Sequence, residues 1–163
     1  MSKNNYKKGS GLAEILVAVF IFSIILGSLV EVASIYLAGS GESLKSTKGA
    51  YLAGEGIEAV KIIRDTGWGN ITSFTDNTNY YLYFDTSSST NNIWKATSTI
   101  SLVDSIFTRT FKSNSVYRDI NGRIVQSGGT LDLHTKKITV SISWKLKNAT
   151  TTKLLSTYIA DIL

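Results

Sequence analysis

The chain has 163 residues, of which 43% are apolar, and it contains neither cysteine nor proline. This length suits one folded domain with a tail or anchor, but not two independent domains. The missing cysteines exclude a disulfide framework, a thiolate metal site and a cysteine nucleophile. The formal net charge of +5 includes Lys3, Lys7 and Lys8 at the extreme N-terminus, so the basic balance is poor evidence for nucleic-acid binding.

The first predicted element is a membrane-spanning helix. Residues 1–9 are polar and basic, whereas residues 12–29 carry a single charge, Glu14, and the apolar character continues to Val32 with only Glu31 added. A bilayer core about 30 Å thick needs roughly 20 apolar residues in a helix, so this segment is long enough to span it. Basic flanks stay cytoplasmic, which predicts that the rest of the chain lies outside.

The second predicted element is an amphipathic helix over residues 35–65, where apolar residues recur mostly at three-, four- or seven-residue steps. It can continue directly from the apolar segment, giving about 55 helical residues. Each glycine inside a helix costs roughly 1 kcal/mol relative to alanine, so local melting or a kink is expected near Gly39 and Gly41. The residues assigned to the buried face are Leu37, Leu44, Leu52, Ile57, Val60 and Ile63.

The middle of the chain is predicted to form strands. Beyond Trp68 the composition shifts to Ser, Thr, Asn and aromatic residues, which favour turns and strands. Strands are expected over residues 93–103, 105–111 and 116–125, with a polar loop over residues 86–92.

The clearest strand covers residues 136–147, because apolar and polar residues alternate strictly there. Residues 148–152 are interpreted as a turn, and residues 154–163 as a final strand that pairs back as a hairpin. The alternating apolar residues are Ile138, Val140, Ile142, Trp144 and Leu146.

These elements predict an α+β fold, in which a long N-terminal helix is transmembrane in its first half and packs its C-terminal half on an antiparallel sheet. The expected organisation is a basic leader over residues 1–9, an apolar transmembrane or filament-core helix over 10–33, its amphipathic continuation over 34–66, and a sheet domain over 67–163.

One motif at the start of the chain carries functional information. Lys7-Lys8-Gly9-Ser10-Gly11-Leu12-Ala13-Glu14 runs directly into the apolar block. It resembles the processing site of type IV pilins and pseudopilins, in which a basic leader ends in glycine and glutamate is the fifth residue of the mature helix. The match places cleavage between Gly9 and Ser10. It departs from the family at Ser10, where a bulky residue is usual, and at Ala13, where Ile or Val is usual.

The resemblance implies a minor pilin or pseudopilin of a type IV pilus or a type II secretion-like filament, which resides in the cytoplasmic membrane before it joins the pilus or pseudopilus. The implied partners are a prepilin peptidase, other pilin or pseudopilin subunits contacted through the N-terminal helix, and the membrane. In the family, the new α-amino group, here on Ser10, is thought to neutralise the Glu14 equivalent of a neighbouring subunit. Whether that amine is methylated stays open. The residues implied in peptidase recognition are Lys7, Lys8, Gly9, Leu12 and Glu14.

The likeness extends more loosely to the rest of the chain. Residues 51–60, 65–68 and 143–144 look like segments of bacterial minor pilins of the pilus-modification type. We interpret the apolar residues in and near these segments as core residues, namely Ile57, Val60, Ile63 and Trp144.

Three other interpretations remain open. Glu14 can lie near the cytoplasmic interface and reach water or a lysine, which avoids the cost of a buried carboxylate. Residues 15–26 also resemble the apolar region of a secretory signal peptide, although residues 30–34 offer only a partial cleavage pattern. Finally, the chain fits a single-span membrane-anchored extracellular binding or adhesion module that does not assemble.

Catalysis has little support in the sequence. His134 is the single histidine and has no nucleophile motif around it, so it is interpreted as a surface turn residue. Residues 119–122 are faintly like a calcium loop and are interpreted as a strand turn. We therefore expect no enzyme activity, no cofactor, no metal and no nucleic-acid partner.

Overall fold

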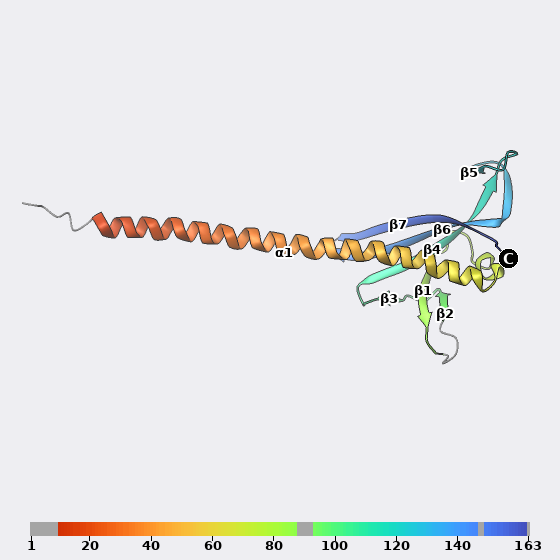
Figure 1. Ribbon diagram of the computed structural model, residues 1–163, viewed down its shortest axis with the longest axis horizontal. Helices are drawn as coiled ribbons and strands as arrows, with labels where there is room; N and C mark the ends of the chain where they lie inside the picture. Colours follow the sequence, from red (N-terminus) through yellow and green to blue (C-terminus); the bar gives the residue numbers. More distant parts are fainter. Residues whose placement is uncertain (1–9, 88–92, 147–148, 163) are drawn as a thin grey trace, which may run out of the picture. The chain divides into compact units, whose positions relative to one another are not determined.

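The fold combines one long helix with one antiparallel sheet, and the predicted α+β class is confirmed (Figure 1). The computed structural model describes residues 10–87, 93–146 and 149–162. The chain divides into two compact units, Met1–Leu44 and Lys45–Leu163. Helix α1, Ser10–Asp65, contributes to both units.

The first unit consists of the N-terminal part of α1. Every side chain from residue 11 to residue 41 is exposed, including the whole apolar block. The expected melting near Gly39 and Gly41 is wrong, because both residues are helical. Two glycines cost about 2 kcal/mol in a helix, whereas starting a new helix beyond a break carries a nucleation cost on the order of 4 kcal/mol.

In the second unit, the C-terminal part of α1 packs one face on the sheet. The first buried residue of α1 is Gly49. The predicted buried face is therefore wrong for Leu37 and Leu44, which are exposed, and correct for its later members. The buried apolar residues of α1 are Leu52, Ala53, Ile57, Ala59, Val60 and Ile63.

The sheet is antiparallel, with the strand order β2-β1-β4-β6-β7, and the two-residue strands β3 and β5 pair with β4. A register shift in the pairing of β4 with β6 lies between Ser115 and Val116. The strands are β1 Tyr80–Asp85, β2 Ile93–Thr97, β3 Leu102–Val103, β4 Phe107–Arg118, β5 Ile124–Val125, β6 Thr130–Leu146 and β7 Ala149–Ala160.

The C-terminal hairpin is confirmed. Strand β6 covers residues 136–146 of the expected strand, and from Thr135 to Leu146 it pairs with β7, for example with Val140 opposite Leu155. The turn expected at residues 148–152 is too long, since Ala149 already pairs with Leu146. Residues 147–148 lie outside the described part of the chain.

The middle of the sheet differs from the prediction. Strand β1 was missed, although its sequence YYLYFD is rich in strand-forming aromatics. The strand expected at residues 93–103 is divided between β2 and β3, and the strand expected at 105–111 belongs to the longer β4. Pairing with β6 on both sides of the register shift extends β4 to Arg118, because each added residue gains a ladder partner. A short helix, α2 (Trp68–Thr72), was also missed.

The core lies between α1 and the face of the sheet that α1 covers. Trp144 is 2% exposed, and its ring centroid lies 5.7 Å from that of Phe107, which confirms it as a core anchor. A second aromatic group joins Phe74 to Tyr80 and Phe111, at centroid distances of 4.7 and 5.0 Å.

Two glycines of α1 differ in how much space the sheet leaves beside them. A Cβ on Gly56 would lie 2.8 Å from Val140 Cγ1, whereas a Cβ on Gly54 would meet nothing within 4 Å. We expect Gly54→Ala to raise the free energy of unfolding by about 1 kcal/mol through helix propensity. Gly56→Ala should lower it by about 1 kcal/mol, since overpacking costs 1–3 kcal/mol and outweighs the same propensity gain. Thermal unfolding of the two variants checks this, and equal stabilisation in both would contradict the close contact.

Candidate functional site

The predicted processing motif overlaps the N-terminal end of α1. Ser10 is the first residue of the helix, and Glu14 follows four residues later, about one turn or 6 Å along the axis. Leu12 is 72% exposed. Lys7, Lys8 and Gly9 lie outside the described residues.

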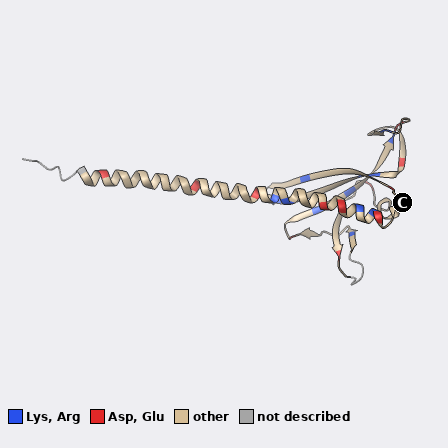
Figure 2. Cartoon of the chain, viewed as in Figure 1, with Lys and Arg blue, Asp and Glu red and all other residues tan. Residues whose placement is uncertain are grey.

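The N-terminal part of α1 exposes an almost wholly apolar surface. Within residues 12–30, the exposed fraction of the large apolar side chains ranges from 47% at Leu26 to 72% at Leu12. Among the described residues, one helix, α1, is long and apolar enough to span a membrane. Figure 2 shows that charged residues are sparse along this part of the helix. Water is a poor solvent for such a surface, so a bilayer or other apolar helices must cover it.

Polar groups inside this apolar surface are few, and the serines among them are satisfied locally. Ser23 donates to the carbonyl oxygen of Val19, and Ser28 to that of Ile25, both at 2.8 Å. Such bonds back to the preceding turn remove the need for water. Glu14 differs, because no ion pair to it occurs among the residues that the structure describes.

In the second unit, a buried arginine was missed by the sequence analysis. Arg109 of β4 is 3% exposed, and its Nη1 donates to Glu55 Oε2 of α1 at 2.8 Å. Its guanidinium carbon lies 4.7 Å from the centroid of the Trp94 ring, which adds a cation–π contact. The sequence pattern could have revealed it, since Arg109 alternates with Phe107 and Phe111 and therefore shares their core-facing side of the strand. Only the fold shows that Glu55 lies opposite.

A second cluster orders the end of β4. Arg118 donates from Nε to Asp132 Oδ2, from Nη1 to the carbonyl oxygen of Gly122 at 2.8 Å, and from Nη2 to Thr135 Oγ1 at 3.2 Å. The hydrogen bond from Arg118, together with those from Thr135 and the backbone of His134, lowers the pKa of Asp132 to about 2. The cluster joins β4 to β6 beyond the register shift at Ser115 and Val116.

This cluster predicts a loss of stability in acid. A lowered pKa means that Asp132 stabilises the fold fully above its ordinary pKa near 4, and that this contribution disappears as the pH falls from about 4 towards 2. After allowance for solvent screening, we expect about 1 kcal/mol. Between pH 5 and pH 2, the free energy of unfolding of the wild type should therefore fall by about 1 kcal/mol more than that of Asp132→Asn, as measured by thermal unfolding at each pH. Equal losses would show that the Arg118 contact contributes nothing.

The residues considered for catalysis or metal binding lie in a strand and in a turn of the second unit. His134 is exposed, as expected, but it lies in β6 rather than in a turn, with Nδ1 3.3 Å from Asp161 Oδ2. Residues 119–122 do form a turn, in which Gly122 has a φ of 77° and Asp119 Oδ1 accepts from the backbone N–H groups of Asn121 and Arg123. Within the described ranges, no group of three or more His, Asp or Glu residues is arranged to hold a metal.

Comparisons of the chain with protein-family models, with curated proteins and with solved structures found no match.

Proposed function

We propose that this chain is a minor pilin or pseudopilin, cleaved by a prepilin peptidase after Gly9 and incorporated through α1 into a type IV pilus or a type II secretion-like filament. The observation that carries this proposal is the exposed apolar surface of α1 over residues 12–30, which bears one carboxylate, Glu14, a single turn after Ser10. The basic leader and Gly9 stand directly before that helix.

The apolar surface supplies the driving force for assembly. Fully burying a Leu, Ile, Val or Phe side chain gives about 1.5–3 kcal/mol relative to leaving it in water. In the precursor the bilayer provides this burial, and in a filament the α1 helices of neighbouring subunits provide it. The side chains involved are those between Ile15 and Leu29. The sheet of the second unit then stays outside the membrane.

Glu14 supplies a constraint on how the helices associate. A carboxylate inside an apolar environment costs several kcal/mol without a partner, and α1 has no cation near it in the sequence after the leader is removed. Cleavage after Gly9 creates an α-amino group on Ser10, which is mostly protonated at neutral pH. Pairing of this amine with Glu14 of an adjacent subunit neutralises both charges and sets the axial position of one helix against the next.

The direct test is the N-terminal sequence and intact mass of the protein from membranes of hosts with and without a prepilin peptidase. We expect a chain that starts at Ser10 only when the peptidase is present. A chain that starts at Met1 in both hosts would leave a single-span anchored binding module as the better description. Cleavage near Ala33 would indicate a secretory signal peptide instead.

A further inference from the structure

The sheet has an outer face that α1 does not cover, and this face is rich in hydroxyl groups. Along β4, Thr108 and Thr110 alternate with Phe107, Arg109 and Phe111, which are buried, and Thr110 is itself only 9% exposed. The pairing continues this face across the neighbouring strands, with Thr110 opposite Ser141 and Ser141 opposite Leu154. The residues that we define as the outer face are Thr108, Thr110, Lys112, Asn114, Lys137, Thr139, Ser141, Ser143, Lys145, Thr150, Thr152, Leu154, Ser156 and Tyr158.

Three adjoining hollows follow the outer face. The central one, of about 500 Å³, is lined by outer-face hydroxyls and by Tyr81 of β1. It shares Thr108 and Ser143 with a hollow of about 570 Å³ beside β3. It shares Thr139 with a third, of about 400 Å³, which Tyr158 also lines. Together they form a trough that crosses β4, β6 and β7.

The charge of the trough has one sign. One lysine lines each hollow: Lys112 the central one, Lys145 the one beside β3, and Lys137 the third. No carboxylate among the described residues lines any of the three hollows. None of the three lysines makes an ion pair within the described chain, and Lys112 Nζ donates to the neutral Asn77 Oδ1 at 3.1 Å. By contrast, Asp85, which alternation places on the same side of β1, is already paired with Lys95 at 2.7 Å.

We propose that this trough binds an acidic polysaccharide. Each lysine offers a cation to a carboxylate or sulfate of the polymer, and the Thr and Ser hydroxyls between them exchange hydrogen bonds with sugar hydroxyls. Tyr81 and Tyr158 supply flat apolar surface with a polar tip. The inference concerns the sheet alone and does not depend on assembly of α1 into a filament.

The spacing of the charges favours a sparsely charged polymer over a nucleic acid. Lys137 and Lys145 are eight residues apart on β6, which is about 26 Å at roughly 3.3 Å per residue. Duplex DNA carries one charge per about 1.7 Å, hence on the order of 15 phosphates over that length. Three lysines would leave most of those phosphates without a partner, whereas a polysaccharide with a carboxylate on every second sugar matches a low charge density.

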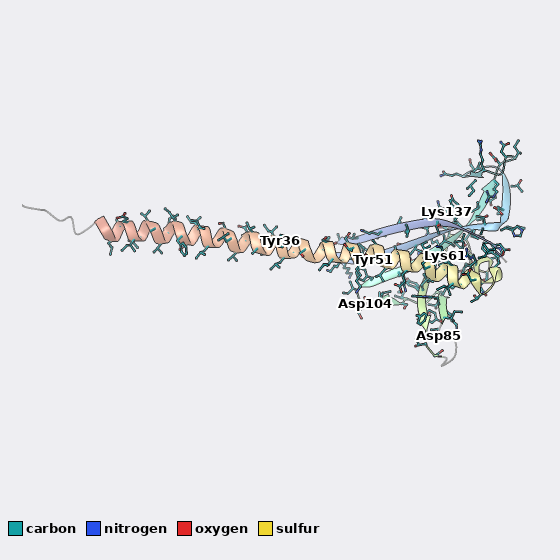
Figure 3. The ribbon with its side chains drawn as sticks, in the orientation of Figure 1. Tyr36, Tyr51, Lys61, Asp85, Asp104 and Lys137 are labelled. Atoms are coloured by element: carbon teal, nitrogen blue, oxygen red, sulfur yellow. The ribbon has the colours of Figure 1, made fainter. Side chains whose placement is uncertain are left out.

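The test measures binding of the full-length protein in detergent micelles to hyaluronan, with dextran as the uncharged polymer and duplex DNA as the competing polyanion. We expect salt-sensitive binding to hyaluronan, weak binding to dextran, and weaker binding to DNA than to hyaluronan. Replacing Lys112, Lys137 and Lys145 with glutamine should raise the apparent Kd for hyaluronan at least tenfold. The matched control replaces Lys45, Lys61 and Lys153, which lie outside the outer face, and should change it less than threefold; Figure 3 labels Lys137 on the sheet and Lys61 on α1.

Several outcomes would overturn the proposal. Equal losses in the two triple variants would indicate attraction by net charge alone, and tighter binding to DNA than to hyaluronan would assign the trough to nucleic acid. Absence of any hyaluronan binding would refute the proposal that the trough binds an acidic polysaccharide. A double variant, Ser141→Ala with Ser143→Ala, keeps every charge and should weaken binding severalfold. An unchanged affinity in that variant would exclude recognition of sugar hydroxyls.

Discussion

Replacing Gly9 with valine is expected to leave the precursor uncut, so that the amount of chain beginning at Ser10 falls more than tenfold. The bond between Gly9 and Ser10 is the predicted cleavage site, and glycine presents no side chain on the leader side of that bond. A branched side chain there would prevent the backbone from entering a peptidase site shaped for glycine. The measurement is the intact mass and N-terminal sequence of the membrane-extracted protein in a host that carries the peptidase.

A matched control separates loss of processing from damage to the membrane segment. Gly27→Val makes the same substitution inside α1, where an added Cβ meets nothing within 4 Å. This variant should insert and mature normally, because valine is well tolerated in an apolar span. If Gly9→Val still matures at Ser10, or if Gly27→Val blocks cleavage to the same degree, the motif does not direct processing and the pilin-like assignment loses its main support.

The largest effect on stability is expected from Glu55→Ala, which should lower the free energy of unfolding by about 3 kcal/mol. Removing one member of a buried ion pair costs roughly 3–5 kcal/mol, because the other charge stays buried without a partner. The side chain of Arg109 is 4% exposed, whereas that of Glu55 is 48% exposed, so the lower end of that range applies. For a chain of this size the midpoint of thermal unfolding should fall by roughly 6–12 °C.

Two further variants make this result interpretable. Glu58 is the same residue type one helix turn away, and it makes an exposed ion pair with Lys61 at 2.7 Å. Glu58→Ala removes that pair and should lower the free energy of unfolding by less than about 0.5 kcal/mol. The double variant Glu55→Ala with Arg109→Met replaces the stranded charge with an apolar side chain and should recover at least half of the loss. A double variant as unstable as Glu55→Ala would mean that packing, and not the unpaired charge, accounts for the effect.

The helix and the C-terminal hairpin were predictable because their signals are local. The apolar block and the steps between Leu52, Ile57, Val60 and Ile63 indicate a helix without reference to any other segment. Strict alternation over Ile138 to Trp144 likewise indicates a strand with one buried face, and a neighbouring strand-forming segment makes a hairpin the shortest connection. The predicted processing motif is contiguous too, so it needs no tertiary contact to be recognised.

The remaining errors come from contacts that are distant in sequence. Nothing near Leu52 in the sequence marks it as a core residue, and only its packing among the buried residues of the second unit shows that it is one. Strand β1 depends on pairing with β2 and β4, and its aromatic residues alone did not distinguish a strand from a turn.

The sequence by itself determined the apolar N-terminal helix, the position of Glu14 relative to Gly9, and the α+β class, since periodicity and motif spacing are properties of consecutive residues. Only the tertiary structure decided that Glu55 meets Arg109, that a close contact forms at Gly56, and that three lysines of β4 and β6 line one trough to which no described carboxylate contributes. Strand register is the physical reason. It brings side chains from separate segments to one face, and a shift of one residue would turn each of them to the other side.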